Sequence, residues 1–232
     1  MLFRSGDASW RAVRTATIPI MKCPSDFGHE LPWSGTAGPG WARGNYACNA
    51  AGIHQPDSLG WTSTENGRSP TSAWTNAWVG LPDTTKAGGV MCINYGAALP
   101  HISNADGTAT TILISEIRVG SHLSPADPRG TWAAGFPGAS VDCASYTWDC
   151  THPNDNNGSA DDCEGAVDDP AGGMGAWLGC PFQQAQSRSH HAGGGVVVAM
   201  CDGSVRWVKN NISQQNWWRM HARDDGVNWT DD

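Results

Sequence analysis

Residues 195–209 read GVVVAMCDGSVRWVK, and this stretch decides the fold. Two short apolar runs flank the pair Asp202-Gly203, and an Asp-Gly pair in that setting is a strong signal for a β-hairpin. The second run alternates, with Val205 and Trp207 on one face and Arg206 on the other. The stretch therefore predicts two antiparallel strands, at 195–201 and 204–209, joined by a tight turn.

The remaining elements are short. Residues 110–117 read TTILISEI, a run of β-branched residues that predicts a central strand. Shorter strands are expected at 45–49 and 89–95. A helix is expected at 212–220, with Ser213 as its N-cap, and a second short helix at 9–14. These elements indicate an α+β chain that is mostly β, with long loops that need disulfides or metal to hold them.

The chain has 232 residues, enough to bury a sizeable core in one large domain. Glycine (29 residues) and proline (14) are frequent, and charged residues make up only 16%, which favours strands and loops over helices. We expect residues 1–22 to be the remnant of an N-terminal helical region. Residues 23–232 are expected to form a single globular domain, with an Asp- and Cys-rich insertion at about 120–187.

Charge and hydropathy exclude two classes of partner. The net charge is −8, whereas a nucleic-acid-binding protein needs a basic surface against the phosphates. The longest apolar stretch, 195–201, is too short to span a bilayer. The sequence therefore predicts no nucleic-acid partner and no membrane span.

Eight cysteines occur without any CxxC pair, which argues against a zinc ribbon. Disulfides in an oxidising compartment are the better interpretation for some of them, so a periplasmic, extracellular or cell-surface location is expected. Two bridges are expected among Cys143, Cys150, Cys163 and Cys180. The N-terminus lacks an apolar export segment. We expect that this segment was removed or that the reading frame is truncated.

An acidic loop is the first candidate site. Residues 154–164 read NDNNGSADDCE, and alternate oxygen-bearing side chains resemble the first half of a calcium loop. The second half departs, because position 12 of such a loop would be Ala166 rather than Glu. The alternative is a solvated loop pinned by Cys150 and Cys163. The predicted calcium ligands are Asp155, Asn157, Ser159, Asp161, Asp162 and Glu164.

A second candidate site is His191 with Asp202. If the hairpin and the preceding loop meet, this pair suits a structural hydrogen bond, a metal ligand or a general base. The alternative is structural, with Asp202 forming the turn and His191 bonding to a nearby backbone carbonyl. Glu116 ends an apolar strand and needs a partner, for which Arg118 or Arg206 is expected. G-x-S-x-G and HExxH motifs are absent from the sequence.

Four segments occur in an order that resembles a known family. They read MKCPSD at 21–26, GNYA at 44–47, ISNADGT at 102–108 leading to ISE at 114–116, and SHHAGG at 189–194 leading to CDGSVRW at 201–207. The ordered set resembles the DUF1559 family of pseudopilin-like proteins with a C-terminal H-x9-DG motif. Two departures stand out: the N-terminal apolar helix of that family is missing, and ten residues rather than nine separate His191 from Asp202.

The resemblance implies a fold similar to that of the major pseudopilins of type II secretion, which have an N-terminal helix followed by an antiparallel sheet. It also implies calcium held in an Asp-rich loop. The chain is therefore expected to be an extracytoplasmic pseudopilin-like protein, stabilised by calcium. Its expected partners are further copies of itself or a secretion or surface machinery.

Two other functions compete with this one. The chain could be a hydrolase of small esters or lactones, such as N-acyl-homoserine lactones, that depends on calcium or another metal. In that case the metal polarises a carbonyl while His191 or an aspartate activates water. The 13 tryptophans suggest a carbohydrate-binding module, unless they serve as core and lid packing.

Overall fold

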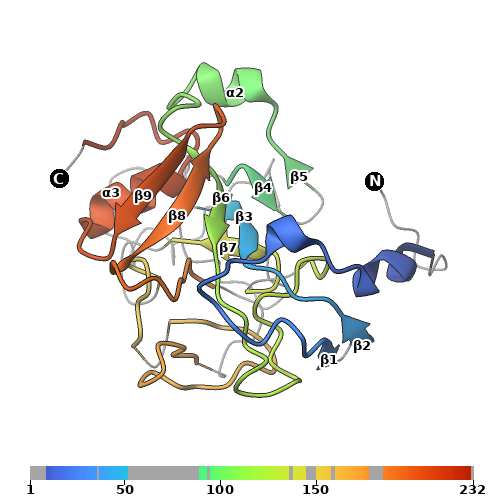
Figure 1. Ribbon diagram of the computed structural model, residues 1–232. Coiled ribbons are helices and arrows are strands. Elements are labelled where there is room, and N and C mark those ends of the chain that lie inside the picture. Colours follow the sequence, from blue (N-terminus) through green and yellow to red (C-terminus); the bar gives the residue numbers. More distant parts are fainter. Residues whose placement is uncertain are drawn as a thin grey trace.

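A five-stranded sheet with strand order β7-β3-β6-β8-β9 forms the centre of the computed structural model (Figure 1). The neighbouring strands run antiparallel, except that β7 runs parallel to β3. The chain is mostly β with few helices, as expected. The strands are β3 (Tyr46–Ala51), β6 (Ile112–Glu116), β7 (Val141–Cys143), β8 (Gly195–Met200) and β9 (Val205–Lys209). The structure describes residues 9–35, 37–51, 89–92, 95–135, 138–144, 150–157, 160–177 and 185–230.

The hairpin predicted from residues 195–209 is confirmed. β8 and β9 pair antiparallel, with Val197 opposite Trp207. Gly203 in the connecting turn has a φ of 87°, in the left-handed region that glycine adopts without steric cost. Val205 and Trp207 lie exposed on one face of β9, as the alternation predicts. The strands expected at 45–49 and 110–117 are confirmed as β3 and β6.

The prediction of a single strand at 89–95 is wrong. The chain instead forms two short antiparallel strands, β4 (Met91–Cys92) and β5 (Tyr95–Gly96). The reversal returns the amide of Ala97 to the carbonyl of Val90, at 2.8 Å. Val90 is thereby buried with Ile102 at the base of this hairpin. A straight strand would have carried the chain away from that apolar cluster.

The other peripheral elements flank the sheet (Figure 1). The helix expected at 9–14 is the 3₁₀ helix η1 (Ser9–Thr15). A second 3₁₀ helix, η2 (Pro19–Met21), follows it, and a short helix, α2 (Leu99–Ser103), lies at one end of the sheet. A two-stranded sheet is formed by β1 (Trp33–Gly35) and β2 (Gly38–Trp41). No described helix is long and apolar enough to cross a membrane.

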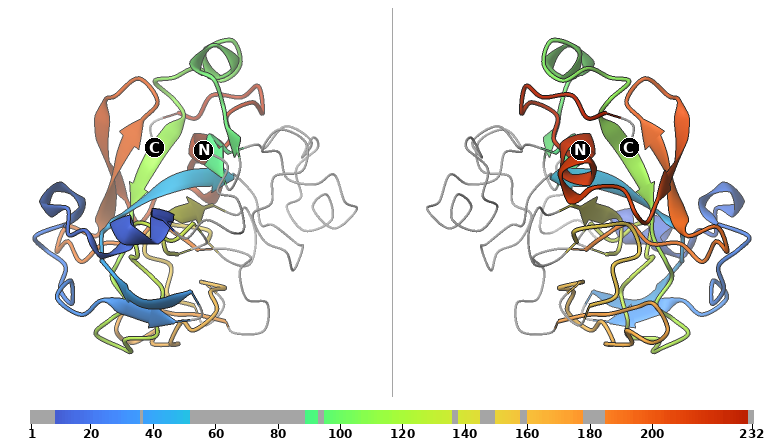
Figure 2. Two further views of the ribbon diagram at one scale, coloured as in Figure 1. Left: turned by 90° about the vertical axis from the view of Figure 1, so that its right-hand side faces the viewer. Right: turned by 90° about the vertical axis from the view of Figure 1, so that its left-hand side faces the viewer.

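The predicted C-terminal helix is α3 (Gln214–His221), and the side chain of Ser213 caps it by accepting the amide of Asn216. Its buried face packs Trp217 and Met220 against the sheet, where Val196, Val198 and Met200 of β8 point. Trp217 and Trp218 are buried, so for these two the core interpretation is confirmed. Trp61, Trp74 and Trp78 lie outside the described residues. Figure 2 shows α3 and the N-terminal segment on opposite sides of the sheet.

Residues 120–188 contribute β7 and a buried ion network. Asp161 lies between two guanidiniums, 3.0 Å from Nη1 of Arg129 and 2.9 Å from Nε of Arg188. Arg129 also pairs with Asp127 at 2.8 Å. All four side chains are at most 2% exposed. Charge pairing therefore holds much of a region that has little apolar content.

The disulfides expected in the insertion do not form among its described cysteines. Cys143, Cys150 and Cys163 are buried and none is in a disulfide, whereas Cys180 lies outside the described residues. Cys143 and Cys150 pack in one apolar cluster, and the thiol of Cys150 donates to the carbonyl of Ala160 at 2.9 Å. In this part of the chain the thiols act as small apolar side chains.

Candidate functional site

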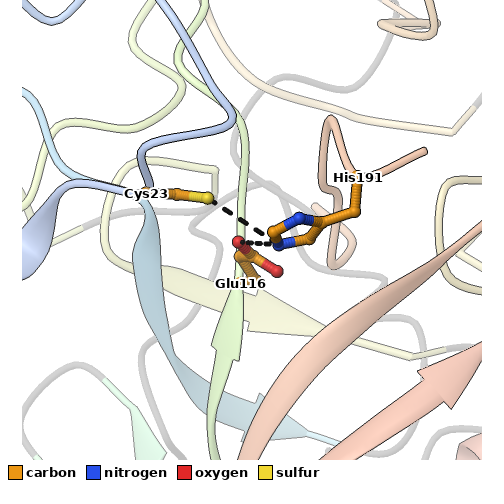
Figure 3. Close-up of side chains that lie close together, drawn as sticks. All are labelled: Cys23, Glu116 and His191. Atoms are coloured by element: carbon orange, nitrogen blue, oxygen red, sulfur yellow. Dashed lines mark hydrogen bonds and ion pairs between the residues drawn. The ribbon is translucent and has the colours of Figure 1, made fainter. Parts of the chain in front are cut away.

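Three side chains from distant segments point toward one another beside the sheet (Figure 3). Sγ of Cys23 lies 3.7 Å from Nε2 of His191, and the same Nε2 lies 3.0 Å from Oε1 of Glu116. Cys23 and Glu116 are almost fully buried, whereas the side chain of His191 is 25% exposed. The cluster is therefore a buried thiol and carboxylate that solvent reaches through one imidazole.

Sheet register explains the position of this cluster. Ser115 of β6 pairs with Val198 of β8, and Val198 faces α3. Successive side chains of a strand point to opposite faces, so Glu116 points away from α3. The N-terminal segment that contains Cys23 crosses this second face (Figure 2). The cluster thus lies where the N-terminal segment meets the sheet.

Backbone contacts fix the carboxylate of Glu116. Its Oε2 accepts the amide of Val197 at 3.0 Å, and its own carbonyl accepts the amide of Arg188 at 2.8 Å. The sequence correctly predicted a partner for this buried carboxylate, but the partner is His191. Of the two arginines expected in that role, Arg118 lies 3.6 Å from Asp26 and Arg206 lies over the ring of Trp229.

Asn45 holds the segment that contains Cys23. Its Oδ1 accepts the amide of Cys23 at 2.8 Å. Its Nδ2 donates to Oδ2 of Asp26 at 2.7 Å and to the carbonyl of Ile117 at 2.9 Å. Oδ2 of Asp26 accepts the amide of Val119 at 2.8 Å. Because these groups are buried and tied to β6 and its continuation, they fix Cys23 beside Glu116.

His191 is fixed by its own loop and by β9. Its amide donates to Oγ of Ser189, which donates in turn to the carbonyl of Gly195. The imidazole packs edge-on against the indole of Trp207, with ring centroids 5.5 Å apart. The ring is therefore positioned even though part of it is exposed.

The electrostatics favour the thiol form of Cys23 in the protein without an ion. Burial raises the pKa of the Cys23 thiol, and the hydrogen bond and the charge of Glu116 raise it further. Burial also raises the pKa of Tyr46, to which the charges of Glu116 and Cys23 add. Tyr46 lies directly opposite Glu116 in the β3–β6 ladder and so shares its face.

The geometry excludes a catalytic Cys–His–acid triad. In a Cys–His–acid triad, the nucleophile and the acid contact opposite nitrogens of the imidazole, so that the acid orients the base. Here Cys23 and Glu116 both approach Nε2 of His191. Three donor atoms of different types converge on one point, which is the arrangement of a chelating site.

The predicted pair of His191 and Asp202 is not brought together. The six residues of β8 lie between them, which corresponds to about 20 Å of extended chain. Asp202 is exposed in the hairpin turn, where it accepts the amide of Ser204 at 2.8 Å and its hydroxyl at 2.7 Å. These two hydrogen bonds lower the pKa of Asp202. Asp202 therefore has the geometry of a turn residue.

The acidic loop does not bring the five predicted ligands that the structure describes to one point. Asp161 is occupied by Arg129 and Arg188, and its Oδ1 accepts the amide of Gln186 at 3.1 Å. Asp162 is also buried. Two arginines around one carboxylate repel a cation, so the structure removes Asp161 from the predicted calcium set.

The outer part of the same loop lies closer to solvent. Asp155 is partly buried and Asn157 is exposed, and Nδ2 of Asn157 lies 2.9 Å from each carboxylate oxygen of Asp155. Glu164 is exposed. Ser159 lies outside the described residues. These positions leave Asp155, Asn157 and Glu164 accessible from solvent.

Sequence reasoning missed Cys23 and Glu116 as partners of His191. Among the described residues, these three form the one group of three or more His, Cys, Asp or Glu side chains whose donor atoms all lie within 4.8 Å of one another. The missed signal was that the residues of this cluster lie in the segments that resemble the family. The segments MKCPSD, GNYA, ISE and SHHAGG contribute Cys23, Asn45, Glu116 and His191, respectively, to this one place.

Most of the chain matches a known family. Residues 2–215 match the model of a family described as "Protein of unknown function (DUF1559)". No curated protein matches the chain, and no solved structure matches it.

Proposed function

The chain belongs to the DUF1559 family, and from that premise we propose that it is an extracytoplasmic, pseudopilin-like module of a secretion or surface assembly. The central sheet is mostly antiparallel, as in the pseudopilins that the family motifs resemble, and this supports the proposal.

The outer edge of the sheet is the observation that carries this proposal. Among the described strands, none pairs with the outer side of β9. That strand presents Val205 at 67% exposure and Trp207 at 42%. An open edge with apolar side chains is a template for pairing with another strand. A cavity of about 510 Å³ beside it is lined by Trp207, Ile212 and Trp229, among others. This edge suits contact with a second copy of the chain.

A single charge on the edge tests the assembly role. Val205→Lys adds a solvated charge to β9, and Val227→Lys is the matched control because Val227 is exposed but lies outside the sheet. Light scattering over a range of concentrations should show self-association of the wild-type chain and of Val227→Lys, but not of Val205→Lys. A wild-type chain that stays monomeric throughout contradicts the assembly role. Fractionation of the native host should recover the protein outside the cytoplasm.

Calcium binding belongs to the same proposal, but with fewer ligands than the sequence predicts. Asp155, Asn157 and Glu164 offer oxygen ligands that solvent reaches, and oxygen donors are what Ca²⁺ prefers. Asp161 does not fit the ligand set because two arginines already neutralise it. A calcium ion here would stabilise the loop by mass action and would take no part in chemistry.

A second candidate function, a metal-dependent hydrolase of small esters or lactones, is favoured by one observation. His191 is a partly exposed imidazole that is held against a buried carboxylate, as a general base requires. The test is hydrolysis of N-acyl-homoserine lactones and simple esters by the pure protein and by His191→Asn. Turnover that His191→Asn abolishes supports this function. Absence of turnover, or equal turnover by both proteins, leaves the assembly role as the proposal.

A further inference from the structure

We propose that Cys23, Glu116 and His191 bind a single thiophilic divalent metal ion of the zinc class, with a fourth coordination position open to solvent. The proposal rests on the geometry of these three residues. It is independent of the assembly role and of calcium binding in the acidic loop. It names a different ion class at a different place in the fold.

The separations of the donor atoms suit tetrahedral zinc. Zinc binds sulfur at about 2.3 Å and nitrogen or oxygen at about 2.0–2.2 Å, so neighbouring donors in a tetrahedron lie about 3.3–3.6 Å apart. Sγ of Cys23 lies 3.7 Å from Nε2 of His191, close to that separation. The distance of 3.0 Å from Nε2 to Oε1 of Glu116 has to widen by a few tenths of an ångström. All three donor atoms lie within 4.8 Å of one another, so side-chain rotations can bring them to the tetrahedral separations.

One cation satisfies all three donors at once. The thiol of Cys23 and the carboxylate of Glu116 face the same nitrogen of His191. A proton on that nitrogen can form a well-aligned hydrogen bond with only one of the two groups at a time. A divalent ion at the centre contacts the thiolate, the carboxylate and the imidazole together. It also neutralises the negative charge that burial would otherwise penalise.

The donor set selects the class of metal. Thiolate and imidazole ligands favour zinc and its transition-metal neighbours, whereas Ca²⁺ and Mg²⁺ take oxygen ligands. Three protein ligands with a fourth position left open is the pattern of zinc sites that keep a water. The side chain of His191 is 25% exposed, so the site lies next to the solvent from which an ion and that water would enter.

Contacts around the ligands already hold them in place. Val197 donates to the second carboxylate oxygen of Glu116, Asn45 accepts the amide of Cys23, and Ser189 accepts the amide of His191. Such surrounding hydrogen bonds orient metal ligands and are worth about 10–100-fold in metal affinity. The chain therefore spends little conformational entropy on assembling the site when an ion binds.

Cobalt and zinc titrations of the full chain test the site. The protein is reduced, stripped with EDTA, freed of the chelator and titrated with Co²⁺. We expect one ion per chain, a thiolate-to-cobalt charge-transfer band in the near ultraviolet, and loss of that band when Zn²⁺ displaces the cobalt. Absence of the band from the wild-type protein overturns the proposal.

Matched variants assign the ligands. Cys23→Ser should abolish the charge-transfer band, and His191→Gln should weaken zinc binding by at least about 100-fold. The controls are Cys201→Ser, a buried thiol on the hairpin, and His190→Gln, the adjacent histidine, and both should keep the band. A band that persists in Cys23→Ser shows that another thiol binds the metal and overturns the assignment.

A measurement on the wild-type protein avoids any variant that fails to fold. Zn²⁺ should slow the alkylation of Cys23 by iodoacetamide, with mass spectrometry reading each cysteine separately. Cys48, which is partly exposed and belongs to no ligand group among the described residues, is the internal control. Selective protection of Cys23 supports the site, and equal protection or no protection of the two thiols overturns it.

Discussion

Oε1 of Glu116 lies 3.0 Å from Nε2 of His191, although 75 residues separate the two in the chain. The contact joins the end of β6 to the loop that precedes β8. The same carboxylate also accepts the amide of Val197. One side chain thus ties together two strands at the point where their backbone ladder ends.

Replacing that carboxylate should destabilise the fold in a graded way. Glu116→Ala leaves the partly buried amide of Val197 without its acceptor and should lower the free energy of unfolding by about 1–3 kcal/mol. Glu116→Gln keeps an acceptor oxygen for that amide and should cost about half as much. Urea unfolding followed by tryptophan fluorescence measures both. Equal effects of the two changes would show that the bond to Val197 has no part in stability.

Removing Asp161 should have a larger effect. Asp161→Asn leaves the buried guanidiniums of Arg129 and Arg188 without their shared carboxylate. Breaking a buried ion pair on one side costs about 3–5 kcal/mol. Glu164→Gln in the same region is the control, because Glu164 is exposed, and it should change stability by less than about 0.5 kcal/mol without calcium. Comparable urea midpoints for the two variants would contradict a structural role for Asp161.

Calcium should raise the thermal unfolding midpoint of the wild-type chain above its value in EDTA, because an ion that binds only the folded state stabilises it. Asp155→Asn should reduce that rise, since it removes a carboxylate charge from the accessible part of the acidic loop. Magnesium at the same concentration serves as the control ion. A midpoint that does not respond to calcium disproves the calcium prediction, and leaves the site at Cys23 unaffected.

The stability of the fold should depend on pH through a partly buried aspartate in the C-terminal segment. Burial raises the pKa of Asp225 to about 7, and the neighbouring Asp106 adds to the rise. The folded chain thus holds this proton more tightly than the unfolded chain, where an aspartate titrates near 3.9. The contribution to stability is present at acidic pH and is lost as the pH rises through about 7.

Asp225→Asn tests that effect. The amide removes the charge and keeps an oxygen that can accept the amide of Val227, as Oδ1 of Asp225 does at 2.9 Å. We expect the variant to lose less stability than the wild type between mildly acidic and mildly alkaline pH. The readout is the urea midpoint of both proteins across that range. Parallel pH profiles would show that Asp225 does not titrate there.

The sequence predicted those parts of the fold that depend on neighbouring residues. Asp202-Gly203 marked the hairpin turn, and Ser213 marked the start of α3, because turns and helix caps are set by local backbone geometry. The strand at 89–95 was predicted wrongly, since the burial of Val90 against Ile102 decided its reversal. Such a contact lies beyond any local pattern.

The candidate site was predicted only in part, for the same reason. His191 was singled out, but its partner was sought in Asp202, eleven positions along the chain, rather than in Glu116. The register of β6 with β8 decides which carboxylate reaches the imidazole, and no motif encodes it. Likewise, the spacing of oxygens in the acidic loop could not reveal that Arg129 and Arg188 would surround Asp161.

The separation of 168 residues between Cys23 and His191 has a consequence for how the chain folds. Bringing such distant points of an unfolded chain together has a large cost in loop-closure entropy. The contact between two side chains does not offset that cost. The three donors therefore converge only after the sheet has formed and the N-terminal segment has crossed it. An ion bound there would mark a late step of folding, and its release would precede unfolding, so metal occupancy would report which molecules have completed their fold.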